Sequence, residues 1–199
     1  MKTLALELSS ARGSLAWLAT EIEFTREWPN DRRNSAAFFE NLQIVQEKFG
    51  APETIIVGLG PGSYAGTRIA ISAAIGIQLS CTARLIGYPS ICAMESDPQE
   101  YVVIGDARRK SFFFARIRGN ELNEGPTLLS EAELKSKLES IEQATPVLCS
   151  ELLAQFQRSV ISFPSALILA KLAKEARRRF CLPPLEPLYL REPHITMPI

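Results

Sequence analysis

The chain has 199 residues, 46% hydrophobic and 22% charged, a composition typical of a globular protein that needs neither disulfides nor metals to form its core. Lysine plus arginine equals aspartate plus glutamate at 22 each, and this zero net charge argues against a protein that binds nucleic acid by itself. The four cysteines are too far apart for a Cys-x-x-Cys motif, and the longest uncharged run, residues 69–83, is too short to cross a membrane. We therefore expect a cytoplasmic protein with reduced thiols.

The first fifty residues change from strand periodicity to helix periodicity. Alternating apolar and polar side chains predict three strands, over residues 4–8, 14–19 and 22–28. From residue 35 the apolar side chains recur at helical spacing, which predicts an amphipathic helix from Ser35 to Phe49 that ends at Gly50; the apolar positions are Phe38, Leu42, Val45 and Phe49, with Phe39 and Ile44 beside them.

A glycine-rich loop from Gly60 to Arg68 lies between a short apolar strand, residues 54–57, and an uncharged helix predicted from Ile69 to Cys81. Glycine permits close backbone approach, and the N–H groups at a helix N-terminus attract anions, so the loop either contacts a phosphate or nucleotide or forms a tight turn against a neighbouring element. The spacing matches neither a P-loop nor a dinucleotide fingerprint and favours the tight turn. The candidate contact residues are Gly60, Pro61, Gly62, Ser63 and Arg68.

A strand near residues 85–87 and a short helix from Pro89 complete the order βββαβαβα, which is typical of an α/β lobe. The remaining chain begins similarly, and we predict two lobes, residues 1–98 and 99–199, the second a reduced copy of the first. Its expected elements are strands at 101–105, 112–118 and 146–149, a loop at 119–125, a helix with the capping box Ser130–Glu133, and a helix from Pro164 to Phe180.

Four segments of the chain resemble the TsaB (YeaZ) family, the non-catalytic partner of TsaD in bacterial tRNA threonylcarbamoyladenosine synthesis. They are residues 4–10, the sequence Gly-Pro-Gly-Ser-Tyr-Ala-Gly-Thr-Arg-Ile from Gly60, residues 103–109 and residues 187–191. The resemblance implies an actin-like, sugar-kinase-like and Hsp70-like (ASKHA) fold of two lobes with mixed sheets. The sequence departs from the family at Glu7, where aspartate is usual, and near residues 33–35, where a histidine is often found.

The resemblance implies a subunit without catalytic residues, metal or cofactor of its own, since ATP and metal are expected on TsaD. It also implies contact with a TsaE-type ATPase and a homodimer when the chain is alone. The pairing surface would lie on the two helices, at Phe38, Phe39, Leu42, Ile69, Ala70, Ala73, Gly76 and Ile77. Residues 32–39 contain no His-x-x-x-His pair of the kind with which the related catalytic family holds its metal, so we do not expect a metallopeptidase.

The alternative is a free-standing ASKHA-type ATPase or phosphotransferase that uses Glu7, Asp106 and the Gly60 to Arg68 loop around magnesium and ATP. Glu7 is either a metal ligand or a polar residue on the strand face opposite Leu6 and Leu8. Asp106 precedes three cations, at 108–110, that fit a solvated turn or a partner contact better than a phosphate hairpin. The sequence leaves open the affinity for a partner, competition between homodimer and heterodimer, and a nucleotide trapped at their interface.

Overall fold

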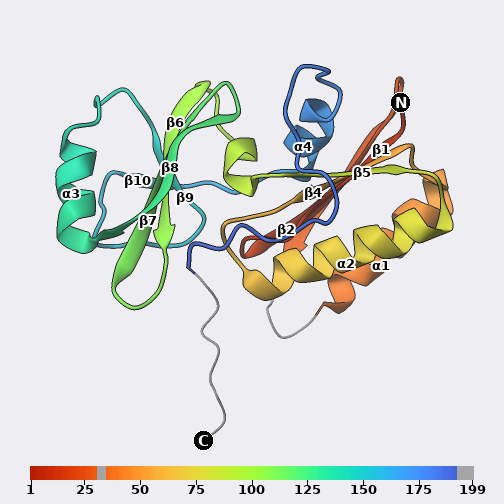
Figure 1. The fold of residues 1–199 in the computed structure, drawn as a ribbon, viewed down its shortest axis with the longest axis horizontal. Helices are drawn as coiled ribbons and strands as arrows, with labels where there is room; N and C mark the ends of the chain where they lie inside the picture. Colours follow the sequence, from red (N-terminus) through yellow and green to blue (C-terminus); the bar gives the residue numbers. More distant parts are fainter. Residues whose placement is uncertain (31–34, 192–199) are drawn as a thin grey trace, which may run out of the picture.

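The chain folds into two lobes that lie side by side, each built on a five-stranded mixed sheet (Figure 1). The computed structural model describes residues 1–30 and 35–191; residues 32–34 and His194 lie outside the described part. The first lobe contains β1 (Thr3–Glu7), β2 (Arg12–Leu18), β3 (Glu23–Pro29), α1 (Ala36–Phe49), β4 (Thr54–Gly58), α2 (Tyr64–Ser80), β5 (Arg84–Tyr88) and the short 3-10 helix Ser90–Ala93. The second sheet and the helices that follow it comprise β6 (Glu100–Asp106), β7 (Ser111–Arg118), β8 (Glu121–Ser130), α3 (Glu131–Glu139), β9 (Val147–Cys149), β10 (Ser159–Ile161) and α4 (Ala166–Leu172).

Both sheets have the same topology. In the first, the order is β3-β2-β1-β4-β5, with an antiparallel β1–β2–β3 meander and parallel β4 and β5. In the second, the order β8-β7-β6-β9-β10 repeats this arrangement strand for strand. α3 occupies the place of α1, whereas residues 150–158, which connect β9 to β10, contain no helix. The predicted α/β fold with a reduced second lobe is confirmed.

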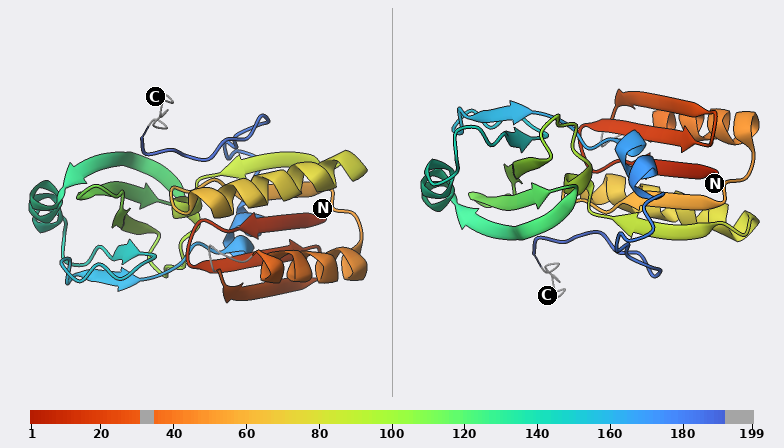
Figure 2. Two further views of the ribbon diagram at one scale, coloured as in Figure 1. Left: turned by 90° about the horizontal axis from the view of Figure 1, so that it is seen from below. Right: turned by 90° about the horizontal axis from the view of Figure 1, so that it is seen from above.

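The first sheet is covered on both faces. α1 and α2 lie on one face of this sheet and α4 lies on the other (Figures 1 and 2). Leu4 and Leu6 pack in the core with α1 and α2, while Ala5 and Ala16 pack with α4. Burial on both sides explains why every residue of β1 and β4 is buried. α4 was expected in the second lobe, but it packs on β1, β2 and β4 of the first.

One apolar cluster joins the two lobes. It combines Ile56 and Ile86 of the first sheet with Val103 and Phe113 of the second, and the 3-10 helix Ser90–Ala93 lies within it. Because this core continues from one sheet into the other, the lobes share buried apolar surface and are not separate bodies on a linker.

Three predicted elements differ in the structure. α2 begins at Tyr64 and not at Ile69, because the Ser63 side chain caps the helix by accepting the Gly66 N–H at 3.3 Å. The predicted loop at 119–125 forms only a two-residue turn, Gly119–Asn120, with φ of 57° and 59°. The acidic residues after it belong to β8, an exposed strand at the sheet edge, where polar side chains face solvent.

The predicted helix from Pro164 to Phe180 is also shorter. α4 ends at Leu172, and tight turns follow, in which the N–H groups of Lys174 and Glu175 bond to carbonyls three residues earlier. Arg178 leaves the helical path to contact the Gly119–Asn120 turn, so tertiary contacts override the local helix preference. Among the described residues, no helix combines the length and the apolar character needed to cross a membrane.

Candidate functional site

A cleft of about 530 Å³ separates the lobes. Its walls are the turn after β1, the glycine loop, the β6–β7 turn, the end of β9 and the C-terminal segment 187–191. The structure therefore brings the predicted residues Pro61, Gly62, Ser63 and Asp106 together with Ser9 and Ser10, which end the family-like segment 4–10. Glu151 and Arg191 also line the cleft and were not predicted as site residues. Glu151 lies in no recognisable motif, and Arg191 ends the family-like segment 187–191, to which no site role was assigned.

The glycine loop packs tightly against the turn that follows β1. A Cβ atom at Gly62 would lie 2.1 Å from the Ser9 carbonyl oxygen, and one at Gly66 would lie 2.1 Å from that of Leu8. The Ser63 N–H donates to the Ser9 carbonyl at 2.6 Å. Gly62 and Gly66 are thus required because another backbone segment approaches them closely. This agrees with the interpretation of the loop as a tight turn against a neighbouring element. Arg68 lies on the exposed side of α2, where its guanidinium donates to the Tyr64 hydroxyl.

Glu7 does not face the cleft. Its side chain is fully buried at the end of β1, where Oε1 accepts the Ser9 N–H at 2.6 Å. Oε2 lies beside Gly58 and the Ser90 hydroxyl and has no hydrogen-bond partner among the described residues. Burial raises the pKa of the Glu7 carboxyl above its ordinary value of 4.5, and the polar groups of Ser9 and Ser90 oppose that shift.

The raised pKa of Glu7 makes stability depend on pH. The folded state holds the Glu7 proton at pH values where the unfolded chain has lost it. The contribution of Glu7 to stability is therefore fully present below pH 4.5 and is lost as the pH rises through the folded pKa. Glu7→Gln keeps an acceptor for Ser9 and has no charge to bury. We expect the free energy of unfolding of Glu7→Gln, relative to wild type, to increase from pH 4.5 to 7.5 in denaturant titrations. The exposed Glu139→Gln is the control, and a constant difference for Glu7→Gln would contradict the assignment.

Asp106 is engaged within its own turn. Its carboxylate accepts the Arg108 N–H at 2.6 Å and the Arg108 guanidinium at 2.9 Å, and its own N–H donates to Glu151 at 3.0 Å. Arg108, Arg109 and Lys110 have φ of 64°, 53° and 59°, so three exposed cations occupy the left-handed region that glycine prefers. The turn therefore places cationic side chains at the rim of the cleft. It also holds the Asp106 carboxylate in an ion pair with Arg108.

These residues do not fit magnesium-ATP as the ASKHA fold would bind it. Glu7 is buried away from the cleft, and the Asp106 carboxylate is paired with Arg108. The α2 N-terminus is partly satisfied internally by Ser63. Within residues 1–30 and 35–191, no three histidine, cysteine, aspartate or glutamate side chains lie close enough to hold a metal ion.

The predicted pairing surface is divided by the fold. Phe38, Leu42, Ala70 and Ile77 are buried against the first sheet in this chain's own core, so they are not available to a partner. Ile69 and Ala73 are half-buried, and Phe39 and Gly76 are exposed. Periodicity identified the helices but not which face the sheet would cover.

The outer face of α2 also carries apolar residues that were not predicted for this surface. Leu79 is 84% exposed and Ile75 is 40% exposed, and they share this face with Arg68, Ser72 and Gly76. We call these five residues the α2 outer face. The spacing of 68, 72, 75, 76 and 79 follows the helical repeat and could have shown that they share one side.

Comparisons with known proteins agree with this architecture. No protein-family model matches the sequence, and no curated protein matches it. Among solved structures, the chain is similar to an "uncharacterized protein with similarity to peptidase YEAZ from Pseudomonas aeruginosa", with a TM-score of 0.75 and 19% identity over 96% of this chain and 99% of that one. The chain has the YeaZ fold.

YeaZ from Pseudomonas aeruginosa gives a TM-score of 0.65 at 19% identity, over 86% of this chain and 90% of that one. The YeaZ fold and the repeated strand order confirm the expected two-lobed ASKHA-like architecture. The word peptidase in the name of the first neighbour describes YeaZ. At this identity the likeness concerns the fold, and activity has to be argued from the residues of this chain.

Proposed function

We propose that the chain is a TsaB-type subunit, the non-catalytic partner that supports a TsaD-type enzyme in threonylcarbamoyl transfer to the tRNA adenosine next to the anticodon. Two observations support this: the YeaZ fold and the four family-like segments, which follow one another along the chain in the expected order. ATP and metal would then be bound by the partner. The cytoplasm, a TsaE-type ATPase as a further partner and a homodimer of the isolated chain belong to the same proposal.

The exposed apolar residues of the α2 outer face are the observation that best supports a role in binding a partner. Leu79 exposes most of its side chain, Ile75 lies one turn away, and Gly76 adds no side chain between them. The glycine allows a partner helix to approach closely. The exposed apolar side chains beside it would then be buried in the interface and removed from water. Phe39 of α1, 49% exposed, adds apolar surface on the same side of the first sheet.

The free-standing ATPase remains the alternative, and the cleft gives it little support. It would need two acidic side chains that reach a metal ion in the cleft. Glu7 is enclosed by Gly58 and Ser90, and Asp106 would first have to release Arg108. The geometry therefore favours a subunit that contributes surface over one that contributes chemistry.

A matched pair of charge substitutions tests the binding role. Leu79→Arg places a cation on the α2 outer face, whereas Leu152→Arg places one at a residue that is 80% exposed in the second lobe. We expect Leu79→Arg to weaken binding of a TsaD-type partner on the order of 100-fold, because a charge would be buried in the interface, and Leu152→Arg to bind normally.

Titration calorimetry with the partner measures the affinities, and circular dichroism checks that both variants fold. Gly76→Arg should behave as Leu79→Arg does, since no atom lies within 4 Å of a Cβ built at Gly76 and the isolated chain can accommodate the larger side chain. Wild-type affinity for both Leu79→Arg and Gly76→Arg would place the interface elsewhere, and equal losses for Leu79→Arg and Leu152→Arg would show that the effect is not specific to α2.

A further inference from the structure

The C-terminal segment, residues 175–191, runs from one edge of the lobe junction to the other. In Figure 1 it is the blue chain after α4, which crosses the first lobe and ends between the lobes. Its two ends contact the second lobe at opposite ends of β7: one at the Gly119–Asn120 turn that follows the strand, the other at the β6–β7 turn that precedes it. We call residues 175–191 the strap.

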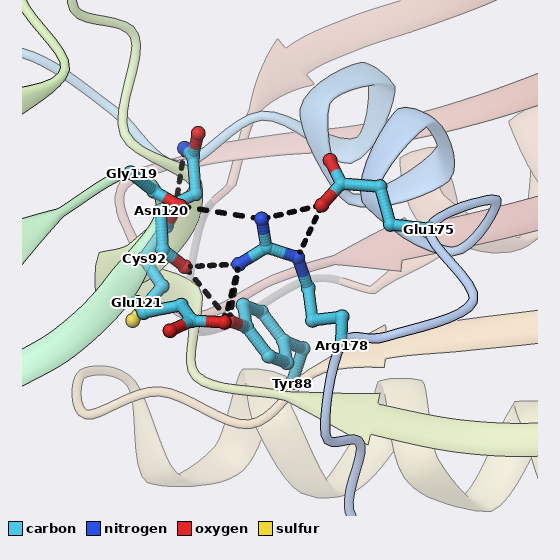
Figure 3. A network of polar contacts seen from close by, with 7 residues as sticks. All are labelled: Tyr88, Cys92, Gly119, Asn120, Glu121, Glu175 and Arg178. Atoms are coloured by element: carbon cyan, nitrogen blue, oxygen red, sulfur yellow. Dashed lines mark hydrogen bonds and ion pairs between the residues drawn. The ribbon is translucent and has the colours of Figure 1, made fainter.

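Arg178 anchors the first end of the strap (Figure 3). Its guanidinium donates to the Gly119 and Asn120 carbonyls of the second lobe at 3.2 and 3.0 Å, and to the Tyr88 hydroxyl of the first lobe at 2.9 Å. Glu175 accepts two further hydrogen bonds from it, at 3.0 and 2.6 Å. The Arg178 side chain is only 8% exposed, so these bonds are largely shielded from water.

The turn reached by Arg178 is itself fastened to the first lobe. The Asn120 side chain donates to the Cys92 carbonyl at 2.8 Å, and the Tyr88 hydroxyl donates to the Asn120 carbonyl at 2.7 Å (Figure 3). Three parts of the chain therefore meet at one guanidinium: the end of β5, the β7–β8 turn and the strap.

Backbone pairing holds the middle of the strap to the first lobe. Cys181 and Gly87 exchange two backbone hydrogen bonds of 2.9 Å, and the Leu188 N–H donates to the Leu59 carbonyl at 2.8 Å. At the far end, the Tyr189 ring lies 5.5 Å from that of Tyr64, and the Arg191 guanidinium reaches the Arg108 carbonyl at 3.5 Å. Residues 187–191 thus form one wall of the cleft.

We propose that the strap holds the two lobes at a fixed angle, so that the cleft keeps one width and does not open and close. β7 spans eight residues, so the two contacts with the second lobe lie roughly 25 Å apart. Rotation of the lobes about a hinge at one end of β7 would break the contact at the other end. Arg178 fastens the end away from the cleft, and through the strap it determines the position of the cleft wall.

Hydrogen exchange on the full chain tests this inference without any ligand or partner. Arg178→Met keeps the length of the stem and removes every donor, and Arg177→Met is the matched control at an exposed neighbour. We expect exchange to rise about tenfold or more in residues 117–122 and also in the distant segments 105–111 and 186–191. Arg177→Met should exchange as wild type does.

Exchange that rises only in residues 117–122 would show that Arg178 is a local contact and overturn the proposal. A uniform rise that includes β1 and β4 would indicate lost overall stability and would also overturn it. If Arg178→Met does not fold, Asn120→Gly removes the bond to Cys92 while suiting the φ of 59°, and we expect the same regional pattern at several-fold amplitude. If hydrogen exchange in residues 105–111 and 186–191 were unchanged in Asn120→Gly, the proposed role of the strap would be wrong.

Discussion

Gly66→Ala should lower the free energy of unfolding by about 2–4 kcal/mol, because the new methyl group would meet a backbone carbonyl. The Cβ atom would lie 2.1 Å from the Leu8 oxygen, and Leu8 belongs to the buried turn after β1, which cannot move aside without disturbing the sheet. The helix would have to shift outward and carry the Ser63 cap with it. Equilibrium denaturation in urea measures the effect.

Gly76→Ala is the matched control, since it makes the same substitution on the same helix. No atom lies within 4 Å of a Cβ built at Gly76, and alanine favours a helix interior over glycine by roughly 0.5–1 kcal/mol. We therefore expect Gly76→Ala to be slightly more stable than wild type. Equal stabilities for the two variants would mean that the contact between α2 and the β1–β2 turn is looser than the structure shows.

Gly58→Ala should destabilise the chain by about 3 kcal/mol or more, for a different reason. A Cβ at Gly58 would lie 1.7 Å from Glu7 Oε2 and 2.6 Å from the Ser90 hydroxyl, in a site where the carboxyl is fully buried. To make room, Glu7 would have to give up its hydrogen bond with the Ser9 N–H.

A double-mutant cycle identifies Glu7 as the cause. In a Glu7→Ala background the carboxyl, which supplies two of the three nearest atoms, is gone. We therefore expect Gly58→Ala to cost at least 2 kcal/mol less than it does in wild type. Urea denaturation of the four proteins gives the coupling energy. Additive effects would show that Glu7 does not occupy the space beside Gly58.

The glycines in and before the Gly60 to Arg68 loop have roles within the chain itself. Gly62 and Gly66 accept the backbone of the β1–β2 turn, and Gly58 makes room for the Glu7 carboxyl. Gly60 has a φ of 89°, which glycine adopts readily. The loop glycines thus have packing or backbone reasons that do not involve a ligand. This is consistent with a subunit whose proposed role depends on the α2 outer face and not on the cleft.

The sequence alone determined the fold class and the order of elements in the first lobe, whereas β8 and β10 of the second lobe were not predicted. Alternation at period two identified β1 to β3, helical spacing identified α1, and the capping box at Ser130 identified α3. These patterns follow from the local geometry of strands and helices, so they do not depend on tertiary contacts. The family-like segments pointed to the same two-lobed fold, which the repeated strand order confirms.

The tertiary structure alone decided which surfaces are covered and where long-range contacts override local preference. Helical spacing cannot tell which face of α2 meets the sheet, so Ala70 and Ile77 were placed on the partner surface while Leu79 was not. The early end of α4 could not be predicted from the sequence either. Arg178 hydrogen-bonds to carbonyls nearly sixty residues earlier in the chain, and this contact takes it out of the helical path. The environment of Glu7 could not be predicted either. A single acidic residue in a strand does not reveal whether its carboxyl reaches solvent, a cleft or, as here, the space left by a glycine on the neighbouring strand.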